Sequence, residues 1–307
     1  MHHRFSGKFK VLATNSAGEE RIVADWFQNL ITDSGLDRLG TAAGSAVWNY
    51  CRVGSGSAAP AFTDTALSSQ VASTNTITQQ QSGIDLAEGF GWRRITWQFA
   101  QGSVSGNLAE LGVSWAASAA GLFSRALIKD SFGNPTTITI LPDETLKVVW
   151  EVRIYWPVTD TTGEVVFTGN IGGTHTFTGR AADVSAVSGK WIPSDANSGG
   201  GIIPVKDDGY VNTGSVLGPI SGTASYSSRL AMIGLVATDD AYVPGSFSAS
   251  MLLTLGLANA NFGGGIDSVI YRSLYHGNSY QMAFSPPIIK TASQIVQLRL
   301  AITWGRA

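Results

Sequence analysis

Residues 125–156 read RALIKDSFGNPTTITILPDETLKVVWEVRIYW, and the end of this stretch decides the fold. Apolar side chains recur there at every second position, namely at Leu146, Val148, Trp150, Val152, Ile154 and Trp156. The other phase holds Lys147, Glu151 and Arg153. This alternation is typical of a strand with one buried face. We therefore predict a strand in which Glu151 points away from the core.

Similar short runs of β-favouring residues follow one another along the chain, separated by Gly, Pro, Asn, Asp and Ser clusters. They include FKVLAT, WRRITWQFA, LAELGVSW, EVVFTG, HTFTGR and FSASMLLTLGL. Helix is expected only near the N-terminus, over residues 25–39, with a weaker candidate over residues 63–71. The predicted fold class is all-β, with antiparallel β-sandwich or jelly-roll-like packing.

An internal repeat divides the chain. Residues 124–142 align without a gap with residues 268–286, and both copies contain a Gly-Asn pair and end on proline. After a four-residue insertion, the apolar positions of 148–156 align with those of 296–304. The carboxylates of the first copy do not recur in the second. The repeated element is therefore predicted to be a scaffold of turn and strands.

The repeat predicts two related β domains, residues 1–157 and 158–307, with a polar linker at the boundary. Gly133-Asn134 and Gly277-Asn278 should occupy equivalent turns between antiparallel strands.

Two further expectations concern burial in these domains. Trp156 and Trp304 should be buried at the ends of matching strands. The polar segment 194–214 is predicted to be a long surface loop of the second domain.

Composition excludes several classes of protein. Charged residues make up only 14% of the chain, and 20 Lys and Arg balance 22 Asp and Glu. No basic run marks a nucleic-acid or anionic-membrane surface, so neither partner is expected. The single cysteine, Cys51, allows no intrachain disulfide and is expected to be a small buried apolar group. Neither a secretory signal nor a membrane span is expected, so the chain should be soluble and made in the cytoplasm.

Four blocks carry a family resemblance. They are NLITDSGLDRLG (29–40), CRVGSGSAAPAFTDTALSSQV (51–71), GNLAELGVSW (106–115) and LFSRALIKDSFGNPTTITILPDETLKVVWEVRIYWP (122–157). In this order they resemble blocks of tailed-bacteriophage virion proteins of the tail tip, baseplate or tail-fibre region. The resemblance covers the first 157 residues. It implies a structural component present in several copies in the virion tail, assembled with other virion proteins after synthesis in the host cytoplasm.

No catalytic motif can be assembled from the residues. The glycine-rich segment 53–59 runs into a proline where a dinucleotide-binding helix should continue. His175 and His276 are the candidate general bases, and each reads better as a turn or strand-end residue. The acidic pairs are Asp143-Glu144, Asp207-Asp208 and Asp239-Asp240, and neighbours on a strand point to opposite faces. The chain is therefore predicted not to be an enzyme and to hold no cofactor or metal.

The alternative function is recognition of a host receptor or glycan. Aromatic and polar residues gather around the second Gly-Asn pair, and a cluster of this kind can bind a sugar ring. The candidate contact residues are Tyr271, Tyr275, His276, Asn278 and Tyr280. Most tryptophans instead fall on strand phases that predict burial. A glycan depolymerase and a capsid decoration protein are the less favoured readings.

Overall fold

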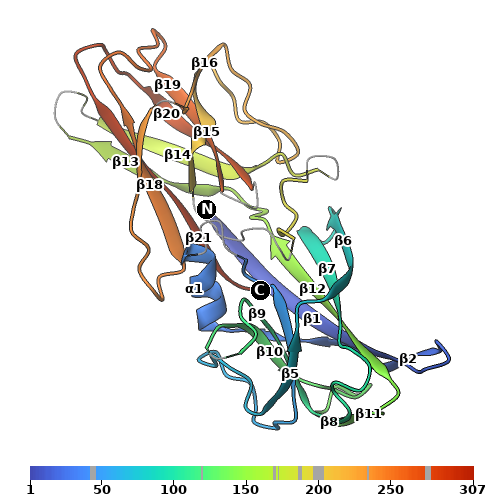
Figure 1. Cartoon of the computed structure of the whole chain (residues 1–307). Coiled ribbons are helices and arrows are strands. Elements are labelled where there is room, and N and C mark those ends of the chain that lie inside the picture. Colours follow the sequence, from blue (N-terminus) through green and yellow to red (C-terminus); the bar gives the residue numbers. More distant parts are fainter. Residues whose placement is uncertain are drawn as a thin grey trace.

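The computed structural model of the chain describes residues 1–41, 46–118, 120–168, 171, 173–185, 189–195, 204–233, 235–273 and 278–307. Figure 1 shows an elongated molecule built almost wholly from strands, with the two chain ends near its middle. The all-β prediction is thus confirmed. Sandwich packing is seen at both ends of the molecule.

The elements before residue 157 are β1 (His2–Thr14), β2 (Glu20–Gln28), β3 (Leu30–Ile31), α1 (Asp33–Thr41), β4 (Tyr50–Gly54), β5 (Gln70–Thr74), β6 (Ile77–Asp85), β7 (Phe90–Gln98), β8 (Gly106–Leu108), β9 (Glu110–Ser114), β10 (Leu122–Leu127), β11 (Ile138–Ile140) and β12 (Thr145–Tyr155). Those after it are β13 (Thr161–Phe167), β14 (Gly173–Ala182), β15 (Pro204–Thr213), β16 (Ser228–Ala231), β17 (Val236–Asp239), β18 (Ser248–Leu255), β19 (Ile266–Ser273), β20 (Ser279–Ile288) and β21 (Val296–Arg306).

One large sheet connects the two ends of the molecule. Its strand order is β17-β18-β21-β1-β12-β7-β6, and β2 also pairs with β1. A five-stranded sheet, β3-β10-β9-β4-β5, packs on one end, and a six-stranded sheet, β13-β14-β20-β19-β15-β16, packs on the other. Strand pairing is antiparallel except between β1 and β21, where residues 2–5 run parallel to residues 303–306. The two smaller sheets take their strands from opposite sides of residue 157, and the division into two domains stays a prediction.

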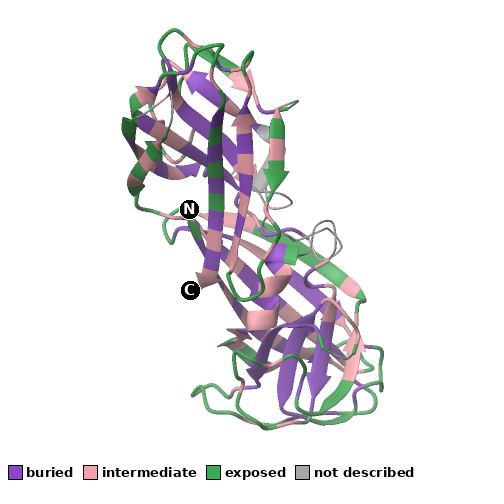
Figure 2. Cartoon of the chain, turned by 90° about the vertical axis from the view of Figure 1, so that its left-hand side faces the viewer, coloured by how far each residue is buried: buried purple, intermediate pink, exposed green. Residues whose placement is uncertain are grey.

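The strand expected over residues 145–156 is confirmed as β12. Its apolar phase is buried and faces the five-stranded sheet, where the rings of Trp150 and Phe123 lie 5.8 Å apart, edge to face. Alternation is equally regular along β21, where buried and exposed residues follow one another (Figure 2). Trp156 and Trp304 are both buried as predicted. The period of two therefore identified the core face of both strands correctly.

The helix is shorter than predicted, and the second candidate helix is absent. Residues 25–28 belong to β2, because Phe27 pairs with Phe9 of β1 and is buried in that position. The helix begins at Asp33, where the Thr32 hydroxyl accepts a hydrogen bond from the Gly35 amide at 3.0 Å. Residues 63–69 form turns that lead into β5.

The predicted surface loop 194–214 is also wrong over most of its described part. Residues 204–213 form β15, which pairs with β16 and β19 inside the six-stranded sheet. Val211 and Asn212 are fully buried there, and the Asn212 amide donates to the Ser268 hydroxyl at 3.0 Å. Residues 196–203 lie outside the described residues. Polar composition misled the prediction because the polar groups are hydrogen-bonded within a sheet.

The two copies of the repeat agree in part. Gly133 has a φ of 83° in a tight turn, as predicted, and Asn278 directly precedes β20, which pairs antiparallel with β19. Gly277 itself lies outside the described residues. The copies then diverge, because β11 pairs with β8 whereas β20 pairs with β19 and β14. Both copies end in a long strand of the large sheet, where β12 and β21 flank β1 on opposite sides.

Candidate functional site

Glu110 of β9 lies fully buried in an ion pair. Its Oε2 lies 2.8 Å from Nη2 of Arg125, and its Oε1 accepts the Ser69 amide at 2.7 Å. Burial alone would raise the pKa of this carboxyl, but the amides of Ser69 and Ser68 and the Arg125 charge outweigh it and lower the pKa. Glu110 therefore stays ionised and links β9 to β10 and to the 68–69 segment.

Glu151 is a second carboxylate that is buried in ion pairs. It lies on the outer phase of β12, as expected, yet only 1% of its side chain is exposed. Three cations cover it: Arg94 at 2.5 Å, Arg153 at 2.7 Å and Lys8 at 3.3 Å. Burial raises the pKa of this carboxyl, and the hydrogen bonds from Arg153 and Arg94 outweigh burial and lower it. The charge faces a layer of basic side chains rather than water.

The remaining carboxylates of the stretch 125–156 have structural partners or face solvent. Glu144 is held by Arg21 at 2.9 Å, and this hydrogen bond lowers the pKa of the carboxyl. Asp130 accepts the amides of Phe132 and Asn134 at 2.9 Å each and so shapes the Gly-Asn turn. Asp143 is exposed. The structure brings no two of these groups together across a cleft.

Three of the five residues proposed for glycan contact are buried. Tyr271 and Tyr280 are cross-strand partners in β19 and β20, their rings lie 5.1 Å apart, and both are fully buried. Asn278 is buried as well, and its side-chain amide donates to the Lys190 carbonyl at 3.1 Å. Tyr275 and His276 lie outside the described residues. Tyr271, Asn278 and Tyr280 therefore belong to the core and cannot stack on a sugar.

The histidines are structural where they are described. His3 is buried in β1, where its Nε2 contacts the Tyr280 hydroxyl. His175 is buried within β14, and its Nδ1 lies 2.7 Å from the Pro286 carbonyl oxygen. Among the described residues, His175 has no carboxylate partner of the kind that orients a general base.

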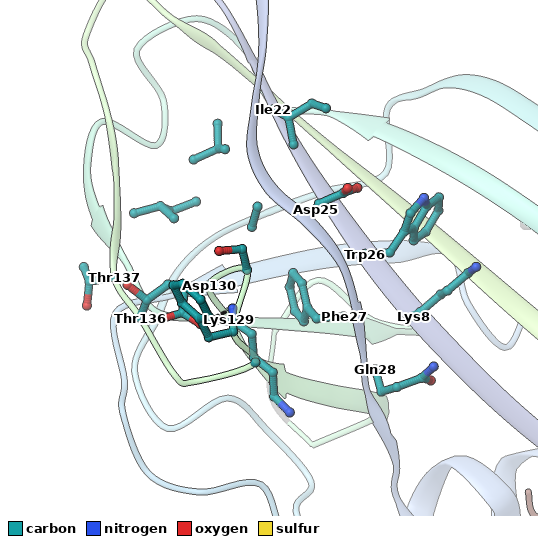
Figure 3. A pocket seen from close by; sticks show the side chains of 16 residues that line it. Lys8, Ile22, Asp25, Trp26, Phe27, Gln28, Lys129, Asp130, Thr136 and Thr137 are labelled. Carbon is teal, nitrogen blue, oxygen red and sulfur yellow. Dashed lines mark hydrogen bonds between the residues drawn. The ribbon is translucent and has the colours of Figure 1, made fainter.

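A groove runs beside the unpaired edge of β2. In the described part of the chain β2 pairs with β1 alone, so its second edge offers backbone groups to an incoming strand. The groove has a volume of about 1020 Å³ and lies between residues 22–28 and the turn-bearing segment 129–138 (Figure 3). We call it the β2 groove.

The β2 groove continues along the chain. A second hollow of about 410 Å³ shares Gln28, Lys129 and Gly133 with it. A third, of about 430 Å³, shares Gln28 and Leu30 with the second and ends at Phe62. Together the three hollows form a trench along residues 22–31, long enough for an extended segment.

The walls of this trench are partly apolar and accessible. Phe132, at the tip of the turn, is 87% exposed, and Ile22 and Phe62 are 57% and 51% exposed. Lys129 lies where the first two hollows meet, and its side chain has no ion pair among the described residues. Exposed large apolar groups around a concave surface are typical of protein interfaces. The sequence offered one signal for this site, a phenylalanine inside a Gly-Asn-Pro turn, where burial is not expected.

Three observations complete the description. Within the described ranges, no three His, Cys, Asp or Glu side chains are grouped as metal ligands. No helix in the same residues is long and apolar enough to span a membrane. Comparison with known proteins found no matching family model, no similar curated protein and no similar solved structure.

Proposed function

We propose that this chain is a non-enzymatic structural component of a bacteriophage tail, in the tail tip, baseplate or fibre-attachment region, and that it assembles with other virion proteins through the β2 groove. The proposal rests first on the four sequence blocks of the N-terminal 157 residues, which resemble tail proteins. The observation that carries the mode of assembly is the open edge of β2 beside exposed Ile22 and Phe132.

Strand addition supplies the physical basis. An extended segment of a neighbouring protein can continue the hydrogen-bond ladder of β2 while its side chains fill the hollows on either side. Ile22 and Phe132 provide apolar contact, and Lys129 provides a cation for an acidic side chain of the partner. The buried ion pairs of Glu110 and Glu151 support a structural, non-enzymatic role, because in them the carboxylates hold neighbouring strands together.

Placement in the particle is the first test. Antibodies raised against this chain should decorate the tails of virions that contain it. Labelling confined to the capsid would instead identify a head-decoration protein. Release of reducing sugar from host envelope, abolished by one Asp or Glu substitution, would contradict the non-enzymatic role.

The groove is tested by Phe132→Asp. An aspartate at an 87% exposed position should leave the fold intact and reduce incorporation into particles at least tenfold. Leu257→Asp is the matched control, since Leu257 is 51% exposed but lies in the turn after β18, away from the groove. Equal incorporation of both variants would show that assembly uses another surface.

A further inference from the structure

The outer face of the large sheet, from β2 to β7, alternates cations with aromatic rings. One row crosses four strands: Trp26 of β2, Lys8 of β1, Glu151 of β12 and Arg94 of β7. The strand register places Lys8 opposite Glu151 and Glu151 opposite Arg94. The Lys8 ammonium lies 4.6 Å from the centre of the Trp26 ring, at the border of the β2 groove (Figure 3). Of the four residues in this row, only Lys8 and Trp26 also line the β2 groove.

Arg94 is the most firmly oriented cation of the row. Its guanidinium carbon lies 4.7 Å from the ring centre of Trp92 and 5.4 Å from that of Trp26. Its Nε donates to Glu151 Oε2 at 2.5 Å. The side chain is nevertheless 37% exposed, and its Nη groups have no hydrogen-bond partner among the described residues. A guanidinium fixed in this way can donate two parallel hydrogen bonds to a carboxylate or phosphate without losing further side-chain freedom.

Trp92 owes its position to a glycine. Gly83 of β6 pairs with Trp92 of β7, and a Cβ at position 83 would lie 2.9 Å from the indole ring. The ring therefore lies over the bare backbone of β6 and supports Arg94 from that side. Any larger residue at position 83 would displace the ring.

More cations surround this row. Arg153 lies 4.1 Å from the ring centre of Phe90, and Arg4 lies 5.6 Å from that of Tyr155. Arg4 is exposed and has no ion pair among the described residues. With Lys10 and Lys147, the outer face carries six cations (Arg4, Lys8, Lys10, Arg94, Lys147 and Arg153) against the carboxylates of Glu151, Asp25 and Glu20. The face is thus positive on a chain whose net charge is −2.

We infer that this outer face binds an acidic polysaccharide, with the guanidinium of Arg94 holding a carboxylate or phosphate group of the polymer. Cations on alternate residues of a strand are separated by about 7 Å, which suits a polymer whose charges are widely spaced. DNA carries one charge per about 1.7 Å of its axis, which is much denser than the spacing of these cations. Aromatic rings between the cations suit sugar rings, which offer apolar C–H surfaces. The inference does not depend on the proposed function, because Arg94, Arg153 and Arg4 lie outside the lining of the β2 groove, although Lys8 and Trp26 belong to both surfaces.

The experiment is a binding titration with the full chain in 0.15 M salt. The probes are a galacturonic acid hexamer, its neutral methyl ester, a glycerol-phosphate oligomer and a DNA 20-mer. We expect at least one of the two acidic probes to bind, and the methyl ester to bind at least tenfold more weakly than the galacturonate if the carboxylate is the recognised group. Binding of the phosphate oligomer alone would identify phosphate as that group.

Variants separate recognition from stability. Arg94→Gln and Arg4→Gln should each weaken binding at least fivefold, and Gly83→Ala should weaken it by moving Trp92 while leaving every charge in place. Arg299→Gln is the matched control, because Arg299 also lies on an outward phase of the large sheet and pairs with a carboxylate, Asp240, at 2.6 Å. Its affinity should equal that of the unaltered protein. A melting temperature recorded for each variant identifies any loss that is due to unfolding.

Three results would overturn the inference. One is that neither acidic probe binds. Another is that DNA binds as tightly as the better acidic probe. The last is that folded Arg94→Gln and folded Arg4→Gln both bind as the unaltered protein does, in which case the outer face is only a stabilising network. Particle incorporation of Phe132→Asp is measured separately, so this failure and that of the proposed function can be told apart.

Discussion

Arg125 and Glu110 face each other across β10 and β9 with their charged atoms 2.8 Å apart, and only 2% of the arginine side chain and none of the glutamate is exposed. Loss of Glu110 leaves the buried Arg125 with Asp64 alone, which lies 2.7 Å away and is 22% exposed. It also removes the acceptor of three donors in residues 68–69. We expect Glu110→Ala to lower the free energy of unfolding by about 3–5 kcal/mol in denaturant titrations.

A surface pair supplies the comparison for that measurement. Lys147 and Glu20 lie 2.9 Å apart, with side chains 27% and 45% exposed. Glu20→Ala should cost less than about 1 kcal/mol. Equal losses in Glu110→Ala and Glu20→Ala would mean that the Glu110 pair contributes no more than a solvated one.

Stability should fall in acid over a defined range of pH. The pKa values of Glu110, Glu144 and Glu151 are all lowered in the folded chain. The unfolded state therefore binds protons first, so the stabilisation is complete above the ordinary glutamate pKa of about 4.3 and is lost as pH falls through the lower folded values. Denaturant midpoints measured from pH 7 to pH 2 should be flat above about pH 5 and decline below it. A decline that begins near neutrality would assign the acid sensitivity to other groups.

The two repeated tryptophans should be equally costly to remove. Trp156 packs edge to face on Trp191, and the Trp304 indole donates to the Leu36 carbonyl at 2.9 Å. Truncation of either to alanine should cost about 3–5 kcal/mol. Arg299→Ala, on the exposed phase of β21, should cost little. Glu151→Ala should cost several times more, because it leaves three cations facing one another. A small loss in the free energy of unfolding for Trp156→Ala would show that the surrounding residues can collapse into the space of the missing ring.

Gly35 gives a test in which helix propensity and packing disagree. Alanine is the better helix former by about 1 kcal/mol. A Cβ at Gly35 would, however, lie 2.3 Å from the Phe123 carbonyl oxygen, which belongs to the backbone of β10. We expect Gly35→Ala to destabilise the chain by about 1–3 kcal/mol. Gly263→Ala, where the added Cβ meets nothing within 4 Å, should be neutral or slightly stabilising in the same thermal unfolding measurement.

Sequence periodicity predicted the fold class and the core face of the long strands, because a strand exposes alternate side chains to two different environments. It could not reveal what covers the second face. Glu151 has the phase of a solvent-facing residue, and only the register of β1, β12 and β7 brings Lys8 and Arg94 over it. For the same reason, the sequence wrongly predicted that Tyr271 and Tyr280 lie on an exposed face, although both are buried.

The helix predicted over residues 25–39 is confirmed from Asp33 onward, and its first part, residues 25–31, was wrong for a related reason. Phe27, Leu30 and Ile31 have helical spacing, but pairing with β1 places Phe27 in the core from an extended backbone. Tertiary pairing overrides local spacing in short segments. The β2 groove and the positive outer face were beyond prediction, because each is formed by residues that are distant in sequence and share no motif.

The parallel pairing of residues 2–5 with residues 303–306 has a kinetic consequence. Residues 2–5 leave the ribosome long before residues 303–306, so the edge of β1 that receives β21 stays open while the strands of the five-stranded sheet are already available to fold. Closing a loop of almost the whole chain is slow, because its entropy must be lost before the new contacts form. Joining of the two ends of the molecule is therefore expected as the late step of folding, and until then β1 offers nascent chains on one polysome a site for mispairing.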